Sequence, residues 1–186
     1  MSNFIEGKRV YLRPFEEEDI ITWFDWFNDP EVTLYMNKGV FPNTKQLQEE
    51  YFKKLLTSKN DVQLAIVLKE NDTLIGAVGI HKIDWIHRNS GISIMIGDKT
   101  LWGKGLAEET IAFIVRHAFT KMNLHKVTAG MMAENYGSRK CFEDNGFVLE
   151  GMQKEQFFYK DRYVDVYLLG LTRKKWEEDN RRRQKY

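Results

Sequence analysis

The sequence predicts an α+β domain in which a mostly antiparallel, mixed sheet is flanked by helices. The chain contains several short runs that either alternate apolar and polar residues or are rich in Val, Ile and Leu. Both patterns are typical of β-strands. Three such runs follow one another directly, which favours antiparallel pairing. Longer segments with apolar residues at helical spacing separate the others. We expect about seven strands and about four helices.

The first quarter of the chain is predicted to hold one strand and two helices. Residues 8–13 alternate in the manner of a strand. Acidic residues precede the apolar run 20–27 and suit the positive end of a helix, which residues 28–30 end with a proline. Residues 43–56 place apolar side chains on one face and predict a second, amphipathic helix.

The rest of the chain continues with strands and two further helices. Asn71 and Asp72 suit a hairpin turn, and Gly146 is placed to end a helix. The expected strands are residues 62–68, 73–80, 90–96, 125–131, 147–150 and 163–170, and the expected helices are residues 105–122 and 135–145.

Length and composition indicate one domain. The 186 residues match a single domain, which we assign to residues 1–172, followed by a basic helix or tail at residues 173–186. The single cysteine, Cys141, excludes a disulfide framework, and no cluster has metal-ligand spacing, so we expect no metal. Since the sequence shows neither a long apolar run nor a signal-peptide core, we expect a cytoplasmic protein without a membrane partner.

The formal net charge of +1 hides an asymmetry. Residues 173–186 hold seven basic and three acidic residues, so this segment carries +4 and the rest of the chain −3. A body of negative sign does not suit a nucleic-acid clamp, and we expect no nucleic-acid partner. Nucleic-acid binding through the arginines at 181–183 is the alternative, less favoured than a solvated end. A homodimer stays open.

The turn Gly103-Lys104-Gly105 joins an expected strand directly to an expected helix. Glycines let a ligand approach the backbone, and the free N–H groups of a helix's first turn bind anions such as phosphates. Lys104 adds positive charge. The turn lacks the third glycine of the dinucleotide fingerprint and the spacing of a P-loop. It therefore predicts a phosphate site of another kind.

The order of motifs after this turn is specific. Asn135-Tyr-Gly-Ser138 and Asn145-Gly-Phe147 follow it, and Val10-Tyr-Leu-Arg-Pro14 opens the chain. Together they resemble the GCN5-related N-acetyltransferase (GNAT) superfamily, in its branch of ribosomal-protein N-terminal, spermidine and amino-sugar acetyltransferases. The resemblance covers nearly the whole chain. It implies the GNAT fold, whose sheet splays in the middle, and an acetyl-CoA-dependent enzyme.

The resemblance also implies how acetyl-CoA, as cosubstrate, is held. The family's loop pattern, Gln/Arg-x-x-Gly-x-Gly/Ala, falls on residues 102–107 with a tryptophan in the first position. Backbone amides there are expected to hold the pyrophosphate, and the strand at 94–96 to pair with the pantetheine. Lys140 and its neighbour Arg139 either reach the 3′-phosphate or are solvated. The expected cofactor-binding residues are Ile94, Met95, Ile96, Trp102, Gly103, Lys104, Gly105, Leu106, Ala107, Asn135, Ser138 and Lys140.

Two catalytic positions of the family are unoccupied in this sequence. The strand glutamate that serves many relatives as base aligns with Gly91, and the tyrosine acid aligns with Phe142. Ser138, with Asn135, is the next candidate to donate a hydrogen bond to the departing sulfur, and its alternative role is to satisfy the helix start. A backbone N–H of the 94–96 strand would bind the carbonyl oxygen. Direct attack on the thioester by an already neutral amine, with water carrying the protons, is compatible with both absences.

Candidate bases are His81, Glu31 and Glu155. His81 follows a strand end and titrates in the useful range, and Glu31 lies where relatives form the acceptor wall. Glu155 is alternatively an exposed charge. Asp165 either faces the acceptor or makes an inter-strand hydrogen bond.

The acceptor is expected to be a small primary amine. The segment 83–88, with Trp85 and His87, resembles amino-sugar relatives, so an amino sugar is the main expectation. A protein N-terminus or a polyamine is the alternative, and a non-catalytic acyl-CoA-binding module is a second one. The aromatic residues at 23–27 are expected to be mostly core instead of acceptor wall.

Overall fold

Residues 3–36 and 41–183 are described by a computed structural model, in which all strands form one sheet of order β1-β2-β3-β4-β5-β6-β8-β7. The strands are β1 (Ile5–Glu6), β2 (Val10–Pro14), β3 (Val62–Leu68), β4 (Thr73–Asp84), β5 (Asn89–Ile96), β6 (Lys126–Met132), β7 (Val148–Tyr159) and β8 (Arg162–Thr172). The helices are α1 (Asp19–Asn28), α2 (Lys45–Thr57), α3 (Leu106–Thr120), α4 (Tyr136–Asp144) and α5 (Arg173–Arg183), with a 3-10 turn, η1 (Lys99–Leu101).

The sheet splays at its centre, between β5 and β6. Every neighbouring pair is antiparallel except this one, which is parallel and pairs only residues 89–91 with residues 126–128. Beyond Gly91 the two strands diverge, while β4 stays paired with β5 as far as Ile96. The expected α+β fold with a splayed, mostly antiparallel sheet is therefore confirmed.

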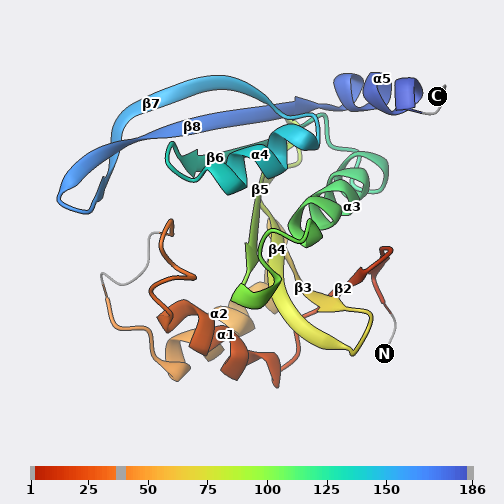
Figure 1. The fold of residues 1–186 in the computed structure, drawn as a ribbon. Helices are drawn as coiled ribbons and strands as arrows, with labels where there is room; N and C mark the ends of the chain where they lie inside the picture. Colours follow the sequence, from red (N-terminus) through yellow and green to blue (C-terminus); the bar gives the residue numbers. More distant parts are fainter. Residues whose placement is uncertain (1–2, 37–40, 184–186) are drawn as a thin grey trace.

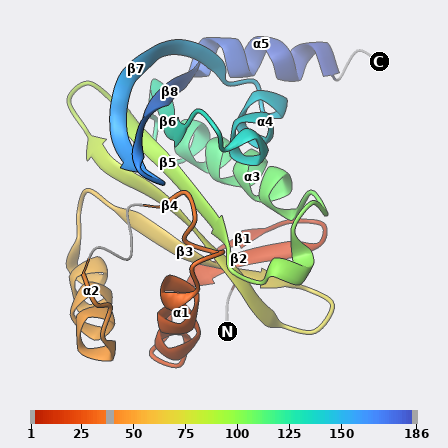
Figure 2. The same cartoon turned by 60° about the vertical axis from the view of Figure 1, so that its left-hand side comes forward.

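Helices cover both faces of the sheet (Figures 1 and 2). α3 and α4 pack on one face over the larger core, while α1 and α2 pack on the other over a second core. Trp23 of α1 is fully buried there and stacks on Phe15, with ring centroids 4.1 Å apart. The prediction that these aromatic residues are mostly core agrees with this packing, since stacked rings bury large apolar areas.

Residues 173–183 of the basic C-terminal segment form α5, which follows β8 at the open end of the β7–β8 hairpin, away from its turn (Figure 1). Trp176 of α5 packs against Phe119 of α3, with ring centroids 5.5 Å apart. The helix is thus seated on the rest of the chain, and the domain boundary at residue 172 stays a prediction. In the described part of the chain, no helix is long and apolar enough to cross a membrane.

Three strands differ most from the expectation. β4 runs on to Asp84 instead of ending at residue 80, so His81 lies within this strand and does not follow its end. β1 is too short, at two residues, to leave a pattern, and β7 extends to Tyr159 instead of ending at residue 150. β7 is an edge strand whose residues are nearly all exposed, and its pairing with β8 is interrupted by two register shifts. A strand without a buried face shows no alternation of apolar and polar residues, which is why the sequence pattern did not reveal it.

Candidate active site

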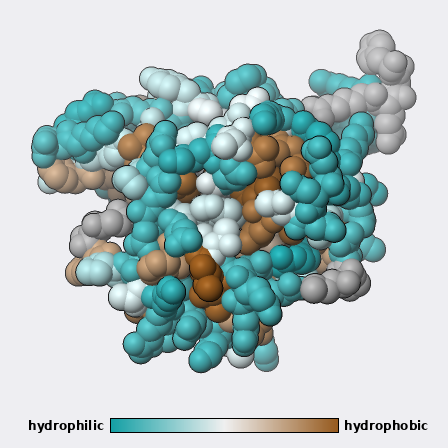
Figure 3. All heavy atoms as spheres, turned by 60° about the horizontal axis from the view of Figure 1, so that its bottom comes forward, coloured by the Kyte–Doolittle hydropathy of each residue, from teal (hydrophilic) through white to brown (hydrophobic). Residues whose placement is uncertain are grey.

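A cleft of about 810 Å³ opens where β5 and β6 diverge. Its walls come from the connection after α1, the far half of β5, the turn before α3, the end of β6, and α4. Figure 3 shows neutral and apolar residues gathered in the middle of the face toward α1 and α2, within a frame of hydrophilic ones. The splay of the sheet therefore creates the site, because an unbroken sheet would leave no space between these strands.

The turn before α3 exposes backbone amides at one end of the cleft. Gly103 and Gly105 both have a φ of +72°, a left-handed conformation that side-chain-bearing residues adopt only with strain. Gly105 is the N-cap of α3, and no side chain caps the helix. The first-turn N–H groups are thus available to an anion, and the helix dipole favours negative charge there. This geometry fits a pyrophosphate.

Arg9 holds this turn from the outside. Its guanidinium donates to the carbonyl oxygens of Lys104 at 2.7 Å and Gly105 at 3.0 Å, and its Nε donates to Glu109 of α3 at 2.8 Å. The carbonyls are therefore engaged on the side away from the amides that face the cleft. Arg9 lies 95 residues before Lys104 in the sequence, and no local pattern pointed to it.

The second wall of the cleft is an open strand edge. Residues 92–96 of β5 pair with β4 on one side, and after Gly91 no strand of the described chain pairs with the other side. At the end of this edge the indole N–H of Trp102 donates to the carbonyl of Ile96 at 2.8 Å. Alternate residues of a strand turn their N–H and C=O groups to the same edge, so Ile94 presents its groups on the open side with Ile96, whereas Met95 turns toward β4 as Gly97 does in donating to Ile75. The free backbone groups of Ile94 can pair with the amides of an extended ligand, as an added strand would.

α4 forms the third wall. The side-chain oxygen of Asn135 accepts from the N–H of Ser138 at 3.1 Å, so Asn135 caps the helix. The hydroxyl of Ser138 lines the cleft and, among the described residues, makes no hydrogen bond, which leaves it able to donate to a ligand. Phe142, at the family's acid position, is 2% exposed and packs edge-on against Phe147.

Two other residues of α4 line the cleft without an evident chemical role. The Nζ of Lys140 pairs with Asp144 at 2.8 Å, one helical turn away, and its side chain remains mostly exposed. Burial raises the pKa of the Cys141 thiol to about 12, so this thiol stays protonated at pH 7 and is a poor nucleophile. In the described ranges, no three His, Cys, Asp or Glu side chains gather as a metal site requires.

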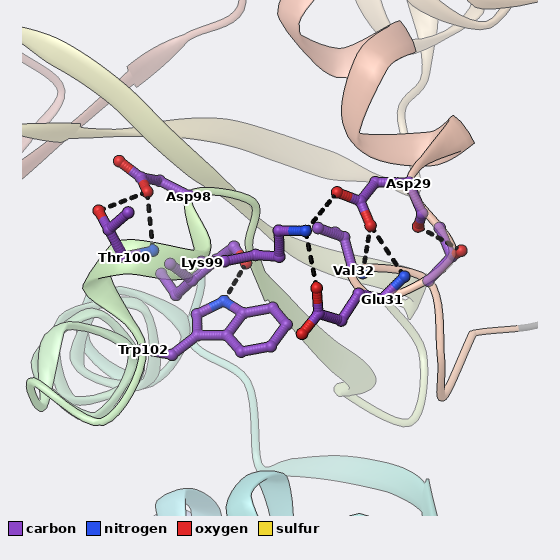
Figure 4. A network of polar contacts seen from close by, with 9 residues as sticks. Asp29, Glu31, Val32, Asp98, Lys99, Thr100 and Trp102 are labelled. Carbon is purple, nitrogen blue, oxygen red and sulfur yellow. Dashed lines mark hydrogen bonds and ion pairs between the residues drawn. The ribbon is translucent and has the colours of Figure 1, made fainter.

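Where the connection after α1 meets η1, one lysine joins two walls of the cleft (Figure 4). The Nζ of Lys99 in η1 lies 2.8 Å from Asp29 and 2.7 Å from Glu31, which follow α1. The hydrogen bonds that Lys99 donates to the carboxylates of Asp29 and Glu31 raise its pKa above the usual range, so the lysine is charged. Glu31 lines the cleft as expected, but its pairing with Lys99 makes it a weak candidate for a base.

His81 lies behind the cleft wall and not in it. Its Nε2 is 2.7 Å from the hydroxyl oxygen of Ser93, a residue of β5 that does line the cleft. Its Nδ1 lies 3.6 Å from Asp61. Burial lowers the pKa of His81, so the imidazole is neutral at pH 7. Ser93 and Asp61 were absent from the sequence-based candidates, because neither belongs to a family motif.

The remaining candidates lie apart from the cleft. Asp165 of β8 accepts from the backbone N–H of Glu155 in β7 at 2.9 Å and pairs with Lys154. Of the two roles considered for Asp165, the structure therefore shows the inter-strand hydrogen bond. The indole of Trp85, in the turn between β4 and β5, donates to the carbonyl of Lys59. The cleft-lining residues do not include this turn, nor Lys104. The other expected cofactor-binding residues line the cleft together, and their roles stay predictions.

The splayed sheet, the open strand edge and the glycine turn define a transferase that takes its acyl group from a coenzyme A thioester. Residues 9–148 match the family described as an acetyltransferase (GNAT) domain. The chain therefore belongs to the GNAT family and is an N-acetyltransferase, which sets aside the non-catalytic binding module.

Two relatives match over most of the chain. An uncharacterized N-acetyltransferase, p20, of Bacillus licheniformis is 31% identical over 176 residues, and the match covers 91% of this chain and 96% of that protein. The spermidine N(1)-acetyltransferase of Vibrio cholerae is 30% identical over 170 residues, with the same coverage.

Among solved structures, the spermidine N-acetyltransferase of Vibrio cholerae in complex with CoA and spermine has a TM-score of 0.84. It is 27% identical, and the match covers 91% of this chain and 98% of that one. A structural relative of this chain thus forms a complex with both CoA and a polyamine.

Proposed function

We propose that this protein transfers the acetyl group of acetyl-CoA to a primary amine of a polyamine. The observation that carries the proposal is the match, along 91% of the chain, to a spermidine acetyltransferase whose structure holds CoA and spermine. At about 30% identity the fold and the donor are shared, whereas the acceptor depends on a few side chains. The acceptor end of the cleft therefore needs its own argument.

Two carboxylates and several apolar side chains line the cleft. Glu31, Val32 and Leu34 come from the connection after α1, and Glu134 comes from the segment after β6. Each carboxylate pairs through one oxygen, Glu31 with Lys99 and Glu134 with Arg162, so the second oxygen of each remains able to accept from an ammonium. Methylene segments between ammonium groups suit the apolar residues. A polyamine matches this pattern better than a polyhydroxylated sugar does.

Aromatic rings support the same choice. Tyr35 and Trp102 line the cleft, and Tyr35 lies 6.0 Å from Tyr159, centroid to centroid. Faces of such rings attract cations. The negative charge of the chain outside its C-terminal segment adds a mild attraction for a polycation.

The donor site follows from the cleft walls. The amides of residues 103–107 would hold the pyrophosphate, and the open edge of residues 92–96 would pair with the pantetheine arm. When bound, acetyl-CoA supplies a thioester whose carbonyl carbon is open to attack by an amine. A β5 backbone N–H would donate to the thioester oxygen, and Ser138 to the sulfur.

The amino sugar, our main expectation from the sequence, has less support than the polyamine alternative. The turn that suggested it, residues 83–88, lies away from the cleft, and the named relatives acetylate spermidine. A protein N-terminus remains the other candidate within the class. A cytoplasmic location and a homodimer stay predictions from the sequence.

The proposal is tested by incubating the protein with acetyl-CoA and single amines and measuring release of free CoA thiol. The panel contains spermidine, spermine, glucosamine and a peptide with a free N-terminus. We expect kcat/KM to be highest for a polyamine. The variant Glu31→Gln, with Glu178→Gln on α5 as control, should raise KM for spermidine about tenfold, since it removes one carboxylate from the cleft. Preference for glucosamine or the peptide would refute the acceptor assignment.

A further inference from the structure

Two polar side chains, His81 and Ser93, lie on the sheet face that carries α1 and α2. His81 pairs across the ladder with Gly91, and Ser93 with Gly79, so all four residues share one face. Ala77 and Met95 continue the same face and belong to the core under α1 and α2. The hydrogen bond of 2.7 Å between His81 Nε2 and the hydroxyl of Ser93 therefore lies on the acceptor side of the sheet.

The backbone makes room for this contact at Gly79. A Cβ at position 79 would lie 2.3 Å from Nε2 of His81, so the imidazole occupies the space of a missing side chain. Folded back over its own strand, the ring reaches the neighbouring strand at Ser93. Ser93 is exposed and lines the cleft, whereas the His81 side chain is only 26% exposed and is reached from the cleft through the serine.

The far side of the imidazole faces a carboxylate that is fixed in place. Asp61, in the loop between α2 and β3, accepts from the hydroxyl of Ser58 at 2.8 Å and from the backbone N–H of Lys82 at 3.1 Å. Partial burial raises the pKa of Asp61, but the hydrogen bonds from Lys82 and Ser58 outweigh it and the pKa lies below its usual value. Asp61 is therefore ionised, with Oδ1 3.6 Å from Nδ1 of His81.

We propose that Ser93, His81 and Asp61 form a relay that removes a proton from the acceptor amine. This role rests on the proposed acetyl transfer to an amine and replaces the family's missing base at Gly91. With the neutral imidazole protonated at Nδ1, facing Asp61, its Nε2 accepts the hydroxyl hydrogen bond of Ser93. The serine oxygen is then free to accept from an ammonium group in the cleft.

The protons and bonds balance without any further reactant. The ammonium gives one proton to the oxygen of Ser93 while the serine gives its own to Nε2 of His81, and Asp61 stabilises the imidazolium. The free amine forms the C–N bond as the C–S bond breaks. The second amine proton goes to the departing thiolate, and the imidazolium, whose side chain is partly exposed, returns its proton to water.

The charges around the imidazole set the direction of its titration. Asp61 faces it from the loop after α2 and raises the pKa of His81, while burial and Lys82 on its own strand lower it, with burial the larger effect. Ser93 on β5 contributes no charge. The imidazole is consequently unprotonated at neutral pH and can act as a base there. At lower pH it becomes protonated and can no longer accept a proton.

The test measures kcat/KM against pH with a polyamine acceptor for the wild type, His81→Gln, Ser93→Ala and Asp61→Asn. In the wild type we expect a plateau between the pKa of His81 and that of the amine. In His81→Gln the plateau should disappear, and log kcat/KM should rise with pH at a slope of one up to the pKa of the amine, about 10. At pH 7 we expect kcat/KM of this variant to be about 100-fold below that of the wild type. Ser93→Ala and Asp61→Asn should each lose about tenfold.

His87→Gln is the matched control, because His87 is exposed in the turn between β4 and β5, outside the cleft. CoA affinity, measured by calorimetry, should stay unchanged in all variants. A plateau and rate retained in both His81→Gln and Ser93→Ala would overturn the relay while leaving the proposed function intact.

An NMR titration of the His81 ring in the unliganded protein gives a readout that needs no turnover. Asp61→Asn should lower the pKa of His81, because it removes the neighbouring negative charge, and His87→Gln should not move it. If the wild type acetylates no amine, the proposed function fails. A His81 titration that Asp61→Asn leaves unchanged overturns the relay in either case.

Discussion

Arg9→Ala tests how the phosphate-binding turn is held. Arg9 makes three charge-assisted hydrogen bonds, two to the carbonyls of the turn and one to Glu109, whose side chain is 11% exposed. Such bonds contribute about 1.5–3 kcal/mol each when shielded. Because the Arg9 side chain is 50% exposed, hydrogen bonds to water replace much of this free energy. We therefore expect Arg9→Ala to cost about 1–2 kcal/mol of the free energy that holds the turn.

If that energy orders the amides for the pyrophosphate, CoA affinity falls roughly 5- to 30-fold. Arg9→Lys should recover only part of the lost CoA affinity, since one ammonium group does not reproduce the forked guanidinium that donates to both carbonyls. Calorimetry with CoA measures the effect. Lys69→Ala is the control, because it removes a cation that pairs with Glu6 and does not contact the turn. An unchanged dissociation constant in Arg9→Ala would refute the positioning role.

Gly105→Glu should abolish CoA binding in calorimetry, because a side chain at φ +72° is strained and its carboxylate opposes the pyrophosphate. Gly151→Glu gives the comparison, since Gly151 lies outside the cleft and has nothing near its Cβ. Ser138→Ala should lower kcat about tenfold with little change in CoA affinity, and equal losses in both would assign it to binding. Glu109→Gln should lower unfolding stability by about 1 kcal/mol at pH 7. Burial raises the pKa of Glu109 but hydrogen bonds from Arg9 hold it below its ordinary 4.5, so this deficit should vanish in urea titrations as pH falls below about 4.5.

Local patterns predicted most of the fold. α3 and the strands β3, β4 and β5 each bury one face or both, so their residues carry a period that the sequence displays. β7 buries almost nothing and was largely missed. The splay between β5 and β6 came from the family resemblance, since no residue pattern within either strand marks where pairing ends.

The donor site could be predicted because one short turn carries it. Gly103 and Gly105 stand in the sequence next to the helix whose amides they expose. Arg9 could not be found in this way, because it meets the turn only after β2 and α3 have packed. The pairing of Glu31 with Lys99 is also a product of folding, and it changes the role expected for Glu31.

Two glycines on the sheet face that carries α1 and α2 show where a basic side chain has space. At Gly91, the position that aligns with the family's glutamate, a Cβ would meet only the carbonyl of His81, at 3.8 Å, so space for a side chain exists there. At Gly79 the space is already taken by the His81 ring, whose hydrogen bond to Ser93 brings a titratable group within one hydroxyl of the cleft. In the proposed relay, a base supplied from the neighbouring strand would make a carboxylate at position 91 unnecessary, and an alignment along β5 alone registers only the missing glutamate.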